Sequence, residues 1–169
     1  MALSMYPASV PVFLRTLQSL RNIVEKAARH AESRKIKPAA LLNARLFPDM
    51  FDLTQQIQIA TDFARGTSAR LAGTEPPAFT DNEQSFDDLL SRIDRTVAYV
   101  QTVRAADIDG SETREIVRPL RGEPHRFTGQ NYLFQFALPN FFFHATTAYA
   151  ILRHNGVELG KSDFIGQLD

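Results

Sequence analysis

Four segments of the 169-residue chain repeat apolar residues at intervals of three and four positions. This spacing places apolar side chains along one side of an α-helix and predicts a buried face. The segments cover residues 9–34, 52–72, 81–105 and 129–155, which makes about 60% or more of the chain helical against ~30–35% in an average protein. We therefore predict an all-α antiparallel four-helix bundle, formed by residues 1–169 as a single domain.

Local residues predict where these helices begin and end. Ser9 and Pro11 are typical of a helix N-terminus, and Gly73 is typical of the position after a helix. Thr80 and Glu83 have the spacing of a capping box, which predicts that the third helix begins there. Pro139 lies inside the last helix, where it frees the carbonyl of Gln135 and predicts a kink.

The connections differ from the long segments. Residues 39–47 lie between two prolines and predict a short helix. Between Glu115 and Phe127 the helical period stops, and Arg121-Gly122 is a turn dipeptide, so we predict a small β-hairpin before the last helix. The tail over residues 157–169 is polar, and we expect it to be irregular.

Composition excludes several partners and sites. Lys and Arg total 19, as do Asp and Glu, and a net charge of zero argues against nucleic acid. The chain has no cysteine, and no apolar run reaches the ~18 residues of a membrane span. The N-terminus lacks the pattern of a signal peptide, so we expect a cytoplasmic protein that binds no membrane. Motifs of the P-loop, dinucleotide-binding and nucleophile-elbow types are absent.

Polar residues lie on the apolar stripes of two helices. At ~100° per residue, Asn140 and His144 fall on the inner stripe of the last helix, between Phe136 and Ile151. Gln56 lies on the inner stripe of the second helix, whereas Gln58 and Asp62 are predicted to point outward.

Burying an unpaired polar group is costly, so Gln56, Asn140 and His144 must bond each other, water or a ligand. One interpretation is structural: His144 bonds Gln56 or Asn140, and Asn140 satisfies the carbonyl that Pro139 frees. The other is a ligand pocket formed by the three residues, with His144 as the candidate catalytic group.

The outer face of the last helix is also apolar. Leu138, Phe142 and Tyr149 lie opposite His144 and require cover from the hairpin or from a second subunit. Zero net charge gives copies of the chain little reason to repel one another. We therefore expect a homodimer in which the same patch meets itself.

Two stretches resemble an uncharacterised bacterial family, a domain of unknown function grouped with the DinB/YfiT-like bundles. They are Arg45-Leu-Phe-Pro-Asp-Met-Phe-Asp-Leu through Ala60, and Phe136-Ala-Leu-Pro-Asn-Phe-Phe-Phe-His through Lys161. The resemblance covers nearly the whole chain and implies an antiparallel four-helix bundle. Many DinB-like members hold a divalent metal with one His from the second helix and an H-x-x-x-H pair from the last. Some are thiol S-transferases or hydrolase-like enzymes, and relatives often pair.

The chain departs from that metal pattern. Only the second His of the pair survives, as His144, because Asn140 takes the place of the first and Gln56 is the polar residue on the second helix. One imidazole and two amides are a poor ligand set for Zn or Ni, so we predict no metal and no cofactor. Three hypotheses stay open. The first is a small-molecule-binding or accessory protein with a degenerate site. The second is a metal-dependent or His144-based transferase or hydrolase that acts on a thiol conjugate or a similar small molecule, and the third is a structural dimer.

Overall fold

The computed structural model describes residues 4–166, and 61% of these residues are helical, in line with the prediction. None of the helices described is long and apolar enough to cross a membrane. The elements in chain order are α1 (Val10–Ser33), α2 (Pro38–Leu42), α3 (Leu53–Leu71), α4 (Phe86–Thr102), α5 (Ala105–Ile108), β1 (Glu115–Leu120), β2 (Glu123–Thr128), α6 (Gly129–Asn131), the π-helical segment η1 (Tyr132–Ala137), α7 (Leu138–His154) and α8 (Lys161–Ile165).

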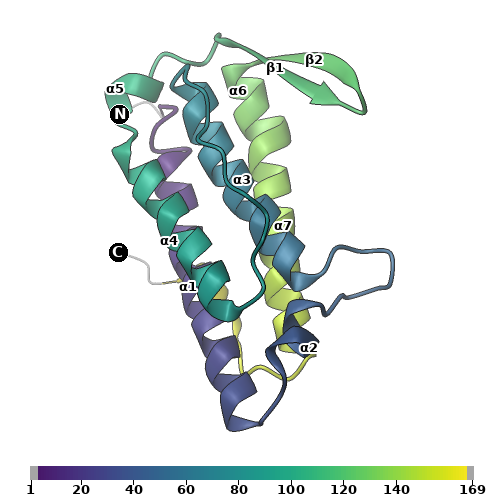
Figure 1. The fold of residues 1–169 in the computed structure, drawn as a ribbon. Helices are drawn as coiled ribbons and strands as arrows, with labels where there is room; N and C mark the ends of the chain where they lie inside the picture. Colours follow the sequence, from purple (N-terminus) through teal and green to yellow (C-terminus); the bar gives the residue numbers. More distant parts are fainter. Residues whose placement is uncertain (1–3, 167–169) are drawn as a thin grey trace.

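The four long helices α1, α3, α4 and α7 lie side by side (Figure 1). The most extensive helix contacts join α3 to α7 and α1 to α4, and both pairs are antiparallel. Residues 73–85 form an extended segment that returns along the length of the molecule after α3 (Figure 1). Because of this crossover, α3 and α4 run in the same direction.

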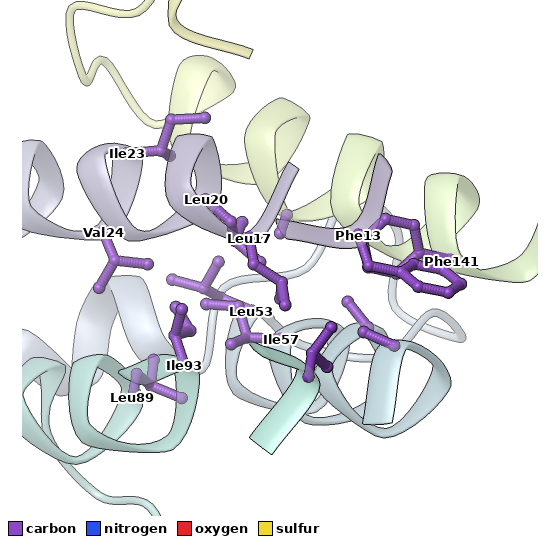
Figure 2. Packing of buried hydrophobic residues seen from close by; sticks show 14 of the residues in the cluster. Phe13, Leu17, Leu20, Ile23, Val24, Leu53, Ile57, Leu89, Ile93 and Phe141 are labelled. Carbon is purple, nitrogen blue, oxygen red and sulfur yellow. The ribbon is translucent and has the colours of Figure 1, made fainter. Parts of the chain in front are cut away.

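Apolar side chains from these helices meet in one core (Figure 2). Phe13 of α1 packs edge-on against Phe141 of α7, with ring centroids 4.9 Å apart. Leu17, Ile57 and Ile93 bring three different helices together and are fully buried. Each such side chain contributes roughly 1.5–3 kcal/mol to the stability of the fold through its removal from water. The apolar stripes of the helices therefore form the core.

The last helix contains a π-helical segment that the sequence did not reveal. The N–H of Leu138 bonds the carbonyl of Leu133, five residues earlier, just before Pro139. A π-helical turn holds one extra residue and rotates the residues that follow it relative to those before. As a result Phe141 is fully buried, while Asn140 is only half-buried at the edge of the face.

Two predicted boundaries and one predicted side-chain cap were wrong. The helix α4 begins at Phe86, where Ser85 accepts a hydrogen bond from the N–H of Asp88, and not at Thr80. Ser9 precedes α1 but forms no side-chain cap, because its hydroxyl donates to the carbonyl of Met5. The connecting helix α2 ends at Leu42, five residues before the predicted end.

The tail is not wholly irregular, because it contains the short helix α8. Asp163 accepts a hydrogen bond from the N–H of Gly160 and forms an ion pair with Lys26 of α1. Phe164 then packs on Tyr149, with ring centroids 5.8 Å apart. Part of the outer face of α7 is therefore covered by α8, a cover that neither sequence alternative included.

The predicted hairpin is confirmed. Its strands β1 and β2 pair antiparallel, with Glu115 opposite Thr128 and Leu120 opposite Glu123. Arg121 and Gly122 both have positive φ, as a two-residue hairpin turn requires. Phe127 of β2 packs against Tyr132 and Phe136, so the hairpin covers the start of the last helical segment.

Candidate functional site

His144 and Gln56 form a buried hydrogen bond between α7 and α3. Nδ1 of His144 lies 2.7 Å from Oε1 of Gln56, and the two residues are 9% and 1% exposed. Nε2 of Gln56 donates to the carbonyl of Phe51, at 3.1 Å, which orients the amide. Since Oε1 can only accept, Nδ1 carries the imidazole proton and Nε2 of His144 keeps a lone pair.

The surroundings of His144 keep its imidazole neutral. The ring stacks on Phe63 at a centroid distance of 6.2 Å and meets Phe143 edge-on at 5.2 Å. Burial lowers the pKa of His144 below its ordinary value, because the charged form is poorly solvated there. A neutral imidazole with an available Nε2 can accept a hydrogen bond or a proton.

Asn140 does not join this pair. Its side-chain Nδ2 donates to the carbonyl of Phe136, at 2.7 Å, within its own helix. That carbonyl is the neighbour of the one that Pro139 frees, so the expected bond to Gln135 was wrong. Of the three predicted residues, the structure brings Gln56 and His144 together and leaves Asn140 apart.

These residues do not fit the divalent metal that the DinB-like resemblance implies. Oε1 of Gln56 accepts from His144, and Nδ1 of His144 is the donor in that bond. Within residues 4–166 there is no cluster of three or more His, Asp or Glu that could hold a metal ion. The donor chemistry favours a hydrogen-bonded pair over a metal centre.

A separate cavity of about 150 Å³ lies between α3, β1 and η1. We call it the arginine cavity, because three arginines line it beside a single carboxylate. Its walls are Asp62, Phe63, Arg65, Gly66, Arg70, Pro76, Arg118 and Tyr132.

Arg65 of α3 enters the arginine cavity nearly buried, at 7% exposure. Its Nη2 donates to Asp62 at 2.7 Å, and its guanidinium lies 4.0 Å from the centre of the Phe79 ring. Nε and Nη1 are buried and have no hydrogen-bond partner among the described residues. Burial lowers the pKa of Arg65.

Arg118 and Arg70 bring two more guanidinium groups to the cavity. Nε of Arg118 is buried without a partner in the part of the chain that the structure describes. Burial, and then the charge of Arg70, lower the pKa of Arg118. Arg70 contacts the hydroxyl of Tyr132 at 3.4 Å and folds back over Gly66, where a Cβ would collide with its Nη1.

Arg92 of α4, by contrast, is fully buried and fully paired. It forms ion pairs with Asp62, Asp81 and Glu83 at 2.8, 2.8 and 3.0 Å. Burial opposes the charge on Arg92, but the hydrogen bond from Arg92 to Glu83 and the three carboxylates raise its pKa. Because Asp81 and Glu83 belong to the segment 73–85, Arg92 fastens that segment to the helices.

Residues 5–165 match the family described as Domain of unknown function (DUF1993). The chain belongs to this family. It is 39% identical to a DinB family member protein from Shewanella denitrificans, with 97% of this chain and 93% of that chain covered and a TM-score of 0.91. No curated protein matches the chain.

The resemblance predicted from residues 45–60 and 136–161 is thus confirmed, and this DUF1993 chain is DinB-like. Sequence reasoning missed its buried arginines. Arg92 lies on the inner stripe of α4 between Leu89 and Ile93, a position that could have identified it. No comparable signal exists for Arg118, because the fold of the hairpin alone brings it to α3.

The face of α3 that carries Gln58 and Asp62 was also misjudged. Both were predicted to point outward, but the segment 73–85 lies over them. Gln58 donates to Glu83 at 2.7 Å, and Asp62 pairs with Arg92. An extended crossover carries no periodic pattern, so the cover was invisible to a helical wheel.

Proposed function

We propose that this DUF1993 chain is a DinB/YfiT-like four-helix bundle, with α1 antiparallel to α4 and α3 antiparallel to α7, that binds a small molecule between α3 and α7 without a metal ion. The observation that carries the proposal is the position of Phe63. Its ring stacks on His144 and also lines the arginine cavity, which makes the two polar sites neighbours along one seam.

The two sites offer complementary chemistry. His144 supplies a neutral acceptor at Nε2, and the arginine cavity supplies N–H donors. Apolar walls with a few oriented polar groups are the usual form of a ligand pocket. Gln56, Asn140 and His144 remain the proposed lining at the α7 end, with Asn140 fixed to its own helix by the bond to Phe136.

A panel of small carboxylates, phosphates, amines and thiol conjugates tests the proposal. For each compound we would record the melting temperature and the ring resonances of His144. A compound at a hundred times its Kd stabilises the folded state by about 2.7 kcal/mol, so we expect a rise of several degrees together with shifted His144 resonances. If no compound moves either signal, the binding function is refuted.

Two variants test where on the protein a compound binds. Phe63→Leu removes the ring shared by both sites and should weaken any compound that binds the seam. Phe47→Leu is the matched control, because Phe47 is 64% exposed on the loop before α3. Equal affinity in both variants would place the ligand elsewhere.

A second candidate is an enzyme in which His144 is the acid or base and Gln56 orients it. The observation that favours it is the fixed tautomer, since Nε2 stays unprotonated and keeps its lone pair. Incubation with a glutathione S-conjugate, followed by mass spectrometry of the products, tests this function. Turnover by the wild type that His144→Gln abolishes would support it, and no turnover would refute it.

A third candidate is a structural homodimer, favoured by Phe142 and Phe143 on the outer side of α7, which are 37% and 56% exposed. We further propose a cytoplasmic location, in keeping with a chain that has no cysteine. The zero net charge supports neither nucleic acid nor an acidic membrane surface as a partner.

A further inference from the structure

We propose that the arginine cavity binds the oxyanion of a small molecule, a carboxylate or a phosphate, through unpaired N–H groups of Arg65 and Arg118. The inference rests on the proposed function and deepens it, because it names the class of ligand that the seam between α3 and α7 accepts.

The cavity contains unpaired hydrogen-bond donors. Nε and Nη1 of Arg65 and Nε of Arg118 are buried and lack partners among the described residues. A buried donor that forms no hydrogen bond destabilises the folded state, and a charged donor does so more strongly. An oxyanion in the cavity provides the acceptors that these groups need, in charge-assisted bonds.

The charges around the cavity are unbalanced. Three arginines line the cavity, and Asp62 is its one acidic residue. Asp62 already accepts hydrogen bonds from Arg65 and Arg92. Asp81 and Glu83 lie outside the lining and pair with Arg92, although the charge of Asp81 also favours the charged form of Arg65. The cavity therefore keeps a positive excess that an anion would offset.

Arg70 lines the same cavity as Arg118. Burial, and then the positive charge of Arg70, lower the pKa of Arg118, as expected for two guanidinium groups at one cavity. The missing Cβ of Gly66 leaves the space in which Arg70 folds back toward the cavity. Like charges held together at a concave surface are stabilised by an anion between them.

Size and walls limit the ligand further. Pockets for whole drug-sized ligands occupy roughly 300–1,000 Å³, so a cavity of about 150 Å³ admits an anionic group with a short chain or one small ring. Phe63 and Tyr132 provide ring surfaces for an apolar part. A small carboxylic acid or phosphate ester fits this combination, whereas a nucleotide is too large.

Calorimetric titration of the full chain with benzoate and with inorganic phosphate tests the inference. Sodium chloride at equal ionic strength controls for screening, and benzamide is the neutral analogue of benzoate. We expect one of the two oxyanions to bind and benzamide not to bind. The oxyanion that binds identifies the source of the charge, and binding of neither would overturn the inference.

Two variants place the anion. Arg118→Gln should weaken binding about tenfold or more, which corresponds to about 1.4 kcal/mol. Arg126→Gln removes the same charge from the same hairpin at an exposed ion pair with Glu115 and should leave the affinity unchanged. Equal affinity in the two variants would overturn the assignment. If Arg118→Gln fails to fold, Arg65→Gln gives the same comparison from α3.

The results also separate this inference from the proposed function. If benzamide or an amine shifts the His144 resonances while neither oxyanion binds, the ligand class is wrong and the binding function stands. If no compound binds at all, both are wrong. If an oxyanion binds and Arg118→Gln abolishes the binding, both are supported.

Discussion

Nδ1 of His144 on α7 donates to Oε1 of Gln56, in the first turn of α3, at 2.7 Å. The DinB-like resemblance assigns a metal to these same two helices. Here a hydrogen bond joins them, and the carbonyl of Phe51 completes it by fixing the amide. The chain thus ties α3 to α7 with neutral groups, which need no ion to be stable in the core.

Loss of one partner of this pair should destabilise the protein. We expect His144→Leu to lower the free energy of unfolding by ~1–3 kcal/mol, because it leaves the amide of Gln56 buried without its partner. Urea denaturation measures the change. The double variant His144→Leu, Gln56→Leu should recover part of the loss, and His154→Leu, at an exposed position, is the control. Unchanged stability of His144→Leu would contradict a satisfied buried pair.

The lowered pKa of His144 predicts how stability depends on pH. In the folded state the imidazole resists protonation, whereas in the unfolded state it takes up a proton near pH 6.5. The contribution of neutral His144 to the free energy of unfolding is therefore fully present above about pH 6.5. It falls as the pH drops below that value, by at most ~1.4 kcal/mol per pH unit for one proton. The loss stops growing below the folded-state pKa.

Denaturation curves between pH 7.5 and pH 5 check this dependence. His144→Gln cannot titrate and should show a flatter profile, while His154→Gln should keep the slope of the wild type. A slope of equal size in both variants would assign the pH effect to other groups.

Glu83 should be the most sensitive residue of the segment 73–85. Its side chain is 2% exposed and pairs with the fully buried Arg92 at 3.0 Å. Removing one partner of a buried ion pair typically destabilises the folded protein by ~3–5 kcal/mol, because the remaining charge is left without a partner. In Glu83→Ala, Asp62 and Asp81 would still contact Arg92. We therefore expect a loss of stability toward the lower end of that range.

Denaturation and limited proteolysis test Glu83→Ala together. We expect the variant to be cut faster within residues 73–85, since the tie to Arg92 is weakened. Asp87→Ala, an exposed carboxylate in the first turn of α4, should resist the protease like the wild type. Equal cutting rates for the two variants would show that the pair does not hold the segment.

The errors in the sequence analysis have a common physical origin. The stripes of α1, α3 and α4 depend on local spacing, and the bond between Gln56 and His144 followed from two such stripes. Thr80 and Glu83 also have the local spacing of a capping box, but in the structure Glu83 pairs with Arg92. The π-helical segment sets which way Phe141 points, and the hairpin sets where Arg118 lies. Neither position follows from residue spacing along the chain.

Arg118 should lower the stability of the ligand-free protein. Its Nε is buried without a partner among the described residues, and Arg70 is a neighbouring like charge. We expect Arg118→Met to raise the free energy of unfolding by up to ~1 kcal/mol, because it removes the unpaired buried Nε–H of this half-buried residue and keeps apolar contact. Thermal denaturation without added anions measures it. A loss of stability would mean that Arg118 is well paired in solution.

Association should depend on Phe142. Tyr149 on the same outer face is covered by Phe164 of α8, but Phe142 stays 37% exposed, beside Phe143 at 56%. An apolar patch on a chain without net charge favours a two-fold contact between copies. We expect light scattering at micromolar concentration to give twice the monomer mass of 19.0 kDa.

Phe142→Glu should restore the monomer mass and keep the helical circular dichroism, because this side chain lies outside the core. Phe47→Glu, which changes a 64% exposed residue on the loop before α3, should leave the dimer intact. A wild-type mass of one chain would refute the dimer, and a dimer that survives Phe142→Glu would place the contact on another face.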